Sequence, residues 1–290
     1  MSFSSEQKTI IIGSNIKSPC CRRSLLQGAL FGRARAESGV VTMSVEQRTY
    51  AEGIAQLVRE FYGKVPEILP PPRGGRCVIL SFSSNSASNY LSKTVSVGEP
   101  YTRKCPSCVS YFLRGVFLTS GKISDPQKQY SLEFTLEQRS DIFRDYLFGL
   151  GLSFGVADKR NGRTVYSRNS TQIEDFLGHA NMNQAMFSLI EARFSAEARK
   201  NIMRALNCET KNMQKTVDAA VEQSKIIARL AEGNLLSSLP DELLTVAKLR
   251  LEYPDYSLAR LAAEASMSKS GLTHRMNKLI EYGKRLLDKK

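Results

Sequence analysis

The sequence of 290 residues predicts an α+β fold in which a duplicated domain is followed by an all-α domain. Two observations predict the duplication. An apolar segment with a central glycine occurs twice, and a similar order of helices and strands follows each copy. A third observation predicts the all-α part, because the apolar residues beyond residue 239 form short stripes with helical spacing.

The two copies of the apolar segment are residues 21–31 and 108–118. In each copy a glycine, Gly28 or Gly115, lies seven residues after a cysteine. Each copy is typical of a helix that is apolar nearly all round. An interior glycine costs a helix about 1 kcal/mol and is tolerated where another backbone approaches closely. We therefore expect the two helices to pack glycine to glycine, as the seam of a pseudo-two-fold domain.

The segments that follow the two copies also correspond. The first copy precedes an expected strand at 39–45, a helix at 50–62, a Pro/Gly-rich turn at 70–75, a strand at 77–82 and a short helix near 87–91. The second precedes strands at 130–136, 154–157 and 164–166, with helices at 141–150 and 171–177. One saddle-shaped domain with two related sheets satisfies both patterns.

A helical connector is expected next, because residues 179–232 contain no Gly or Pro and their apolar positions recur every 3.6 residues. We expect two helices with a break near 207–210, where Asn207 or Thr210 caps the second. Gly233 and Asn234 then end the connector. Its basic residues favour a solvated face over a phosphate-contacting brace, and they are Arg199, Lys200, Arg204, Lys211 and Lys215.

The C-terminal part has the pattern of a helix-turn-helix unit. A first helix at 241–253 ends at Pro254, Ser257 caps a second, and Ser268 caps a third after a tight turn at 266–268. We expect these apolar side chains to face inward: Leu243, Val246, Ala247, Leu251, Leu258, Leu261, Ala262, Ala265, Leu272, Met276 and Leu279. Two short helices, a three-residue turn and a polar third helix are typical of a unit that places its last helix in the DNA major groove. The turn position of Ser266 favours a positive φ.

The charge pattern favours a nucleic-acid partner. The net charge is +13, and the excess of basic residues lies towards both ends of the chain. On the third helix we expect Ser270, Thr273, His274 and Asn277 to contact bases. The expected phosphate ligands there are Ser268, Lys269, Arg275 and Lys278.

A second basic region surrounds the first repeated helix. It contains Arg22, Arg23, Arg33 and Arg35, followed by Arg73, Arg76, Arg103 and Lys104. This surface is a possible second DNA contact. A protein partner or a small molecule is the alternative occupant.

Short motifs occur along the whole chain: the opening Met-Ser-Phe-Ser-Ser-Glu at 1–6, Cys-Cys-Arg-Arg at 20–23, Leu-Arg-Gly at 113–115, Gly-Lys-Ile-Ser-Asp-Pro at 121–126, Asn-Cys-Glu-Thr at 207–210, Lys-Thr-Val at 215–217 and Ser-Lys-Ser-Gly at 268–271. Through these motifs the chain resembles the WhiA family of bacterial sporulation and cell-division regulators, and its repeated helices resemble the LAGLIDADG motif of homing endonucleases. The resemblance implies a LAGLIDADG-like domain at 1–180, a helical connector at 181–238 and a helix-turn-helix domain at 239–290.

The resemblance also implies a function, which is the regulation of transcription of cell-division, cell-cycle, chromosome-segregation or sporulation genes through promoter DNA in a Gram-positive bacterium. Homing endonucleases hold divalent metal with one carboxylate at the end of each LAGLIDADG helix. Here Arg33 and Ser120 occupy those positions, while Glu37 and Asp125 lie beyond the helix ends. We therefore expect no catalytic residue and no cofactor. The alternatives are a residual metal-dependent nuclease and an adaptor that is tethered to DNA and holds a protein partner.

Four cysteines raise the question of a metal. Cys105 and Cys108 have zinc-knuckle spacing, and Cys20 and Cys21 occupy the related position in the other half. All four thiols converge if the helices pair, but adjacent cysteines suit a tetrahedral site poorly. We therefore favour small residues near helix starts over a metal ligand set. His179, at a helix boundary without an acid partner, is expected to have a structural or surface role.

No apolar run approaches the roughly 18 residues that a membrane span requires. We therefore expect no membrane contact and a cytoplasmic, nucleoid-associated protein with reduced cysteines.

Overall fold

The structure is a computed structural model that describes residues 2–71, 75, 77–97, 104–136, 139–159 and 162–288. The chain divides into two compact units, Met1–Ala196 and Glu197–Lys290, hereafter unit 1 and unit 2. The three-part division that the sequence suggests stays a prediction. Arg73, Arg76 and Arg103 lie outside the described residues.

Unit 1 is built from two halves with the same order of elements. The first half comprises α2 (Pro19–Arg33), β1 (Ala34–Glu37), β2 (Val40–Val45), α3 (Arg48–Tyr62), β3 (Glu67–Leu69), β4 (Val78–Ser83) and α4 (Asn85–Val97). The second comprises α5 (Cys108–Ser120), β5 (Gly121–Ile123), β6 (Leu132–Thr135), α6 (Ser140–Gly149), β7 (Gly155–Lys159), β8 (Gly162–Ser167) and α7 (Ser170–His179). The antiparallel sheets have corresponding strand orders, β1-β2-β4-β3 and β5-β6-β8-β7. The predicted duplication and α+β class are confirmed.

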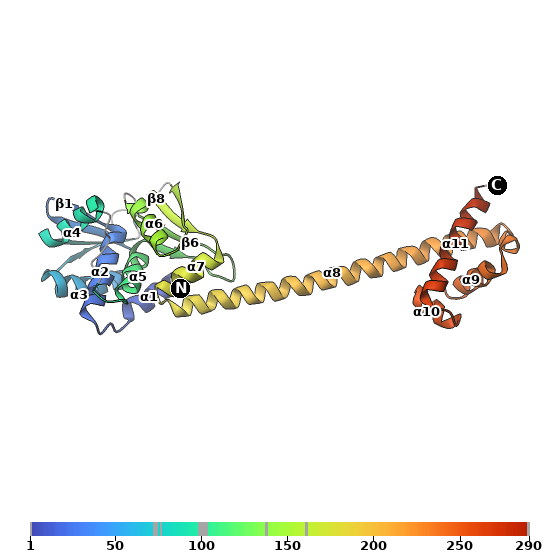
Figure 1. The fold of residues 1–290 in the computed structure, drawn as a ribbon. Helices are drawn as coiled ribbons and strands as arrows, with labels where there is room; N and C mark the ends of the chain where they lie inside the picture. The colour runs from blue at the N-terminus through green and yellow to red at the C-terminus, as the bar shows by residue number, and fades with distance from the viewer. Residues whose placement is uncertain are drawn as a thin grey trace. The chain divides into compact units, whose positions relative to one another are not determined.

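Helices α2 and α5 form the predicted seam and lie between the two sheets (Figure 1). A Cβ atom built on Gly28 would lie 2.1 Å from the carbonyl oxygen of Phe112, and one built on Gly115 would lie 2.1 Å from that of Leu25. Only glycine allows two backbones to approach so closely. The helices therefore meet glycine to glycine.

A first helix, α1 (Phe3–Gly13), precedes the two halves, and its Ser5 carbonyl accepts a hydrogen bond from the Tyr50 hydroxyl at 2.9 Å. The core of unit 1 extends across both halves. Phe31 of the first half packs on Phe112 and Phe143 of the second, with ring centroids 5.5 and 6.0 Å apart. The two halves therefore share one hydrophobic core.

The connector differs from the prediction. The break expected near 207–210 is wrong, because one helix, α8, spans Asn183–Glu232. Thr210 does not cap a new helix there. Its hydroxyl donates to the carbonyl of Leu206 at 2.8 Å, a bond that side chains make inside a continuous helix. The expected end is confirmed, since Asn234 has φ 55° and a 3-10 turn follows at Leu236–Ser238.

Unit 2 continues with α9 (Asp241–Glu252), α10 (Leu258–Glu264) and α11 (Lys269–Leu287). Its core lies between these helices and includes Ile227 of α8, Leu261 and Met276, all fully buried. Among the described residues, no helix has both the length and the apolar character that crossing a lipid bilayer requires.

Candidate nucleic-acid interface

The three C-terminal helices begin and turn as the sequence predicts. The Ser257 side chain accepts a hydrogen bond from the Arg260 amide, and Ser268 accepts one from the Gly271 amide at 3.1 Å. Both are N-caps, which satisfy amides that the first helical turn leaves free. Between the helices Ser266 has φ 51°, the left-handed conformation expected at that turn position. Helices α10 and α11 therefore form a helix-turn-helix pair.

The buried side of α11 fixes which side chains remain on its surface. Leu272, Met276 and Leu279 are fully buried, as predicted. The side chains opposite this stripe are exposed, and they include Ser268, Lys269, Ser270, His274, Asn277 and Lys278. The helix thus presents a polar, cationic surface.

Two of the predicted contact residues are partly buried and have partners within unit 2. The Thr273 hydroxyl donates to the Lys269 carbonyl at 2.7 Å. Arg275 lies 3.8 Å from a Glu242 carboxylate oxygen and donates to the Met267 sulfur. These residues therefore have an intramolecular role in addition to any role at a ligand.

Lys269 and Lys278 differ from Arg275, because no carboxylate of the described residues lies within ion-pair distance of either ammonium group. Asn277 differs from these lysines because it lies beside α8. It lines a hollow of about 340 Å³ together with Ala219 and Glu222 of α8. The predicted residues that are exposed and lie outside that hollow are Ser268, Lys269, Ser270, His274 and Lys278.

The expected inward position of Leu251 is wrong. Leu251 is 41% exposed, whereas the neighbouring Arg250 is 1% exposed. The guanidinium of Arg250 donates to the Tyr256 carbonyl at 2.5 Å and to Gln223 Oε1 of α8 at 2.8 Å. Burial lowers the pKa of Arg250. The spacing gives a signal that could have identified this residue, because position 250 lies three residues after Ala247 and continues the stripe.

The structure does not bring the four arginines of unit 1 together. Arg22 and Arg23 lie in the first turns of α2, where Arg22 pairs with Glu60 at 2.8 Å and Arg23 lies over the Phe61 ring. Arg33 ends the same helix, roughly 15 Å away at 1.5 Å per residue. Arg33 and Arg35 line a groove of about 600 Å³.

The ends of α2 and α5 are where LAGLIDADG nucleases would carry their metal-binding acids. Here α2 ends at Arg33 and α5 at Ser120, whose buried hydroxyl donates to the Val116 carbonyl at 2.7 Å. Asp125 lies beyond β5 and accepts from the Gln127 amide. Neither position supplies the carboxylate that a nuclease metal site uses, because Arg33 carries a positive charge and the uncharged Ser120 hydroxyl is buried and donates within its own helix. His179 is an exposed residue at the end of α7.

Comparisons with known proteins agree with this architecture. The model of the WhiA LAGLIDADG-like domain matches residues 109–199, and that of the WhiA C-terminal HTH domain matches residues 202–282. A solved structure of full-length WhiA from Thermotoga maritima superimposes with a TM-score of 0.63 at 21% identity, covering 98% of this chain and 99% of that one. A solved N-terminal LAGLIDADG domain of WhiA gives 0.50 at 22% identity, covering 62% of this chain and 90% of that one.

Sequence relatives give the same result. A protein of Heliobacterium modesticaldum named "Probable cell division protein WhiA" is 30% identical over 307 residues, which is 96% of this chain and 95% of the relative. The protein of the same name from Clostridium acetobutylicum is 38% identical over 179 residues, and this match covers 60% of the chain and 56% of the relative's length. With its LAGLIDADG-like fold and helix-turn-helix domain, this chain belongs to the WhiA family.

Proposed function

We propose that this protein is a sequence-specific DNA-binding regulator of transcription whose helix α11 enters the major groove. The observation that carries the proposal is the exposed side of α11. Helix α11 is the third helix of a helix-turn-helix domain, and it presents polar and cationic side chains opposite its buried stripe.

The start of α11 favours an anionic partner. Its first amides and the positive end of its dipole point towards the N-cap, Ser268, and Lys269 follows directly. Lys278 lies about 13 Å further along the same helix at 1.5 Å per residue. Glu281, an acid of α11, pairs with Arg285 of the same helix. Two lysines that have no carboxylate partner among the described residues therefore face solvent along a helix of the size that the major groove admits.

Within this proposal, Ser270 and His274 contact base edges, because both are exposed near the start of the helix. Asn277, Thr273 and Arg275 stay among the proposed contacts, although each also has a place within unit 2. Lys269 and Lys278 bind phosphates and set the register of the helix.

We further propose that the DNA is promoter DNA of cell-division, chromosome-segregation or sporulation genes in a Gram-positive cytoplasm, at the nucleoid. The names of the relatives as cell division proteins support this. In unit 1 we propose Arg33 and Arg35 as a second phosphate contact, since they line one groove. Arg22 and Arg23 remain predicted contacts and have partners within unit 1.

The substitution Lys278→Ala tests the proposal. The full-length variant should bind duplex DNA more weakly, and the slope of log K against log salt should fall by about 1, because one phosphate contact is lost. Fluorescence anisotropy over a salt series, with genomic fragments that co-purify with the protein, measures both quantities.

The matched control is Lys64→Ala, which removes one exposed charge from unit 1. It should leave the slope unchanged. If Lys278→Ala binds with the affinity and slope of the unmodified protein at every salt concentration, this side of α11 does not contact DNA.

A further inference from the structure

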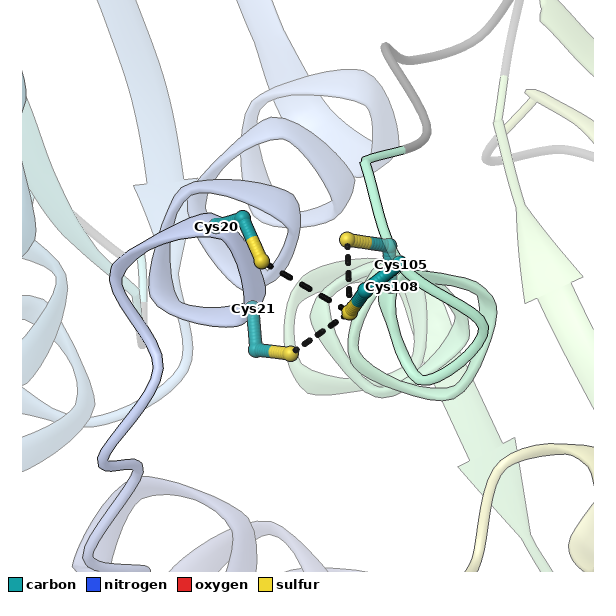
Figure 2. Close-up of side chains that lie close together, drawn as sticks. All are labelled: Cys20, Cys21, Cys105 and Cys108. Carbon is teal, nitrogen blue, oxygen red and sulfur yellow. Dashed lines mark hydrogen bonds between the residues drawn. The ribbon is translucent and has the colours of Figure 1, made fainter.

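Four cysteines from two distant places in the sequence meet at one end of the α2–α5 pair (Figure 2). Cys20 and Cys21 lie in the first turn of α2, Cys105 lies in the turn before α5, and Cys108 is the first residue of α5. The Sγ of Cys105 is 3.6 Å from that of Cys20, 3.6 Å from that of Cys21 and 3.5 Å from that of Cys108. All four sulfur atoms lie within 4.8 Å of one another.

We propose that these four thiols, as thiolates, bind one Zn²⁺ ion in a structural tetrahedral site. The sequence favoured no metal, because two adjacent cysteines rarely supply neighbouring ligands. In the structure that objection is weaker. Successive residues of a helix point about 100° apart, so Cys20 and Cys21 approach Cys105 from two sides.

The separations fit one ion. With Zn–S bonds of about 2.3 Å, the sulfur atoms of a regular tetrahedron lie about 3.8 Å apart. The three separations that involve Cys105 are 3.5 to 3.6 Å. Since no pair of the four sulfur atoms is more than 4.8 Å apart, a regular tetrahedron requires movements of at most about 1 Å. A disulfide would bring two sulfurs to about 2.05 Å and leave the other two thiols unused. A cluster of several irons would hold its cysteines further apart, because bridging sulfides lie between them.

The surroundings also suit a closed metal site. Cys21 and Cys108 are buried, and Cys20 and Cys105 are half-buried, so the ion would be largely shielded from water. Both helices begin at the site, and helix N-termini stabilise negative charge. Lys104 directly precedes Cys105 in the sequence and would partly offset the net charge of −2 on a zinc ion with four thiolates.

The role of such a site follows from its full set of protein ligands. Four protein ligands leave no open position for water or substrate, which is typical of structural zinc. The ion would join the start of the first half's seam helix to the start of the second's. This site lies at the opposite end of α2 from Arg33, and no residue of α11 contributes to it.

Elemental analysis of the full-length protein, purified under reducing conditions without chelator, tests the proposal. We expect about one zinc ion per chain. The double variant Cys21→Ser with Cys108→Ser should lose it. The matched control, Cys77→Ser with Cys208→Ser, changes the two cysteines outside the cluster and should retain the metal.

A second measurement does not depend on the variants folding. Reduced wild-type protein that has been stripped of metal and titrated with Co²⁺ should show thiolate-to-cobalt charge transfer in the near ultraviolet and the strong visible bands of a tetrahedral sulfur site. Three results would each overturn the proposal: wild-type protein without zinc and without these bands, metal retained by the Cys21/Cys108 variant, or a disulfide among the four cysteines after reducing purification.

Discussion

At Gly28 and Gly115 the backbones of α2 and α5 touch. A Cβ atom added at Gly28 would meet backbone atoms of α5, namely the Phe112 oxygen at 2.1 Å and the Val116 nitrogen at 2.9 Å. Backbone atoms in two packed helices cannot turn aside as the end of a side chain can. The usual benefit of alanine in a helix, about 1 kcal/mol, is therefore outweighed here.

We predict that Gly28→Ala lowers the free energy of unfolding by about 3 kcal/mol or more, because α2 and α5 must separate. The chain contains no tryptophan, so urea unfolding should be followed by circular dichroism and tyrosine fluorescence. The control is Gly149→Ala, where no atom lies within 4 Å of the new Cβ, and it should be neutral or stabilising by up to about 1 kcal/mol. Equal stability of the two variants would show that the seam has room for a methyl group.

At the scale of elements, unit 2 depends on contacts between α8 and α9. Arg250 is a buried cation without a carboxylate partner among the described residues, and its guanidinium binds carbonyl oxygens beyond the end of α9. It also binds Gln223, which is 7% exposed. Arg250 therefore donates hydrogen bonds to carbonyl groups that follow the C-terminal end of α9, and it links that helix to α8.

We predict that Arg250→Met, which keeps most of the side-chain volume, costs unit 2 about 2–3 kcal/mol, because Gln223 and the Tyr256 carbonyl lose their donor. Hydrogen exchange of the full chain, followed by mass spectrometry, should show faster exchange in α9 and α11 and no change in unit 1. Lys248→Met, an exposed lysine of α9, is the control and should exchange as the unmodified protein does. If hydrogen exchange in α9 and α11 is unchanged in Arg250→Met, the buried guanidinium does not stabilise unit 2.

Helices that have a long stripe of regularly spaced apolar residues, or a side-chain N-cap, could be predicted from the sequence. The helices capped by Ser257 and Ser268, and the turn at Ser266, depend on neighbouring residues only. The strands β1, β3 and β5 have three or four residues and are defined by pairing with β2, β4 and β6, so no local pattern indicated them. The break in α8 was wrongly expected because Thr210 suits a cap and a helix interior alike.

At the scale of the whole molecule, a LAGLIDADG-like fold carries an arginine and a serine at the ends of its two seam helices. We predict that the purified protein does not cleave its target DNA in Mg²⁺ or Mn²⁺, since Arg33 and Ser120 end the seam helices. A gel assay with plasmid containing the bound promoter measures this. Metal-dependent cleavage that disappears in Asp125→Ala would refute the prediction.

The exposed side of α11 and the cysteine cluster differ in how well they could be predicted from the sequence. The exposed side of α11 was predictable, because its buried stripe has helical spacing within one segment. The cysteine cluster was predictable only as a consequence of helix pairing, because Cys20 and Cys105 are 85 residues apart and their distance depends on how two helices cross. The sequence suggested that these thiols could converge, and only the packing of α2 on α5 brings them together.

The shared seam has a consequence for how the molecule assembles. Since α2 and α5 bury each other, and Phe31 packs across the boundary, neither half of unit 1 can complete its interior alone. The repeats should thus melt in a single cooperative step, and a chain severed between them should yield two fragments that acquire structure only when mixed.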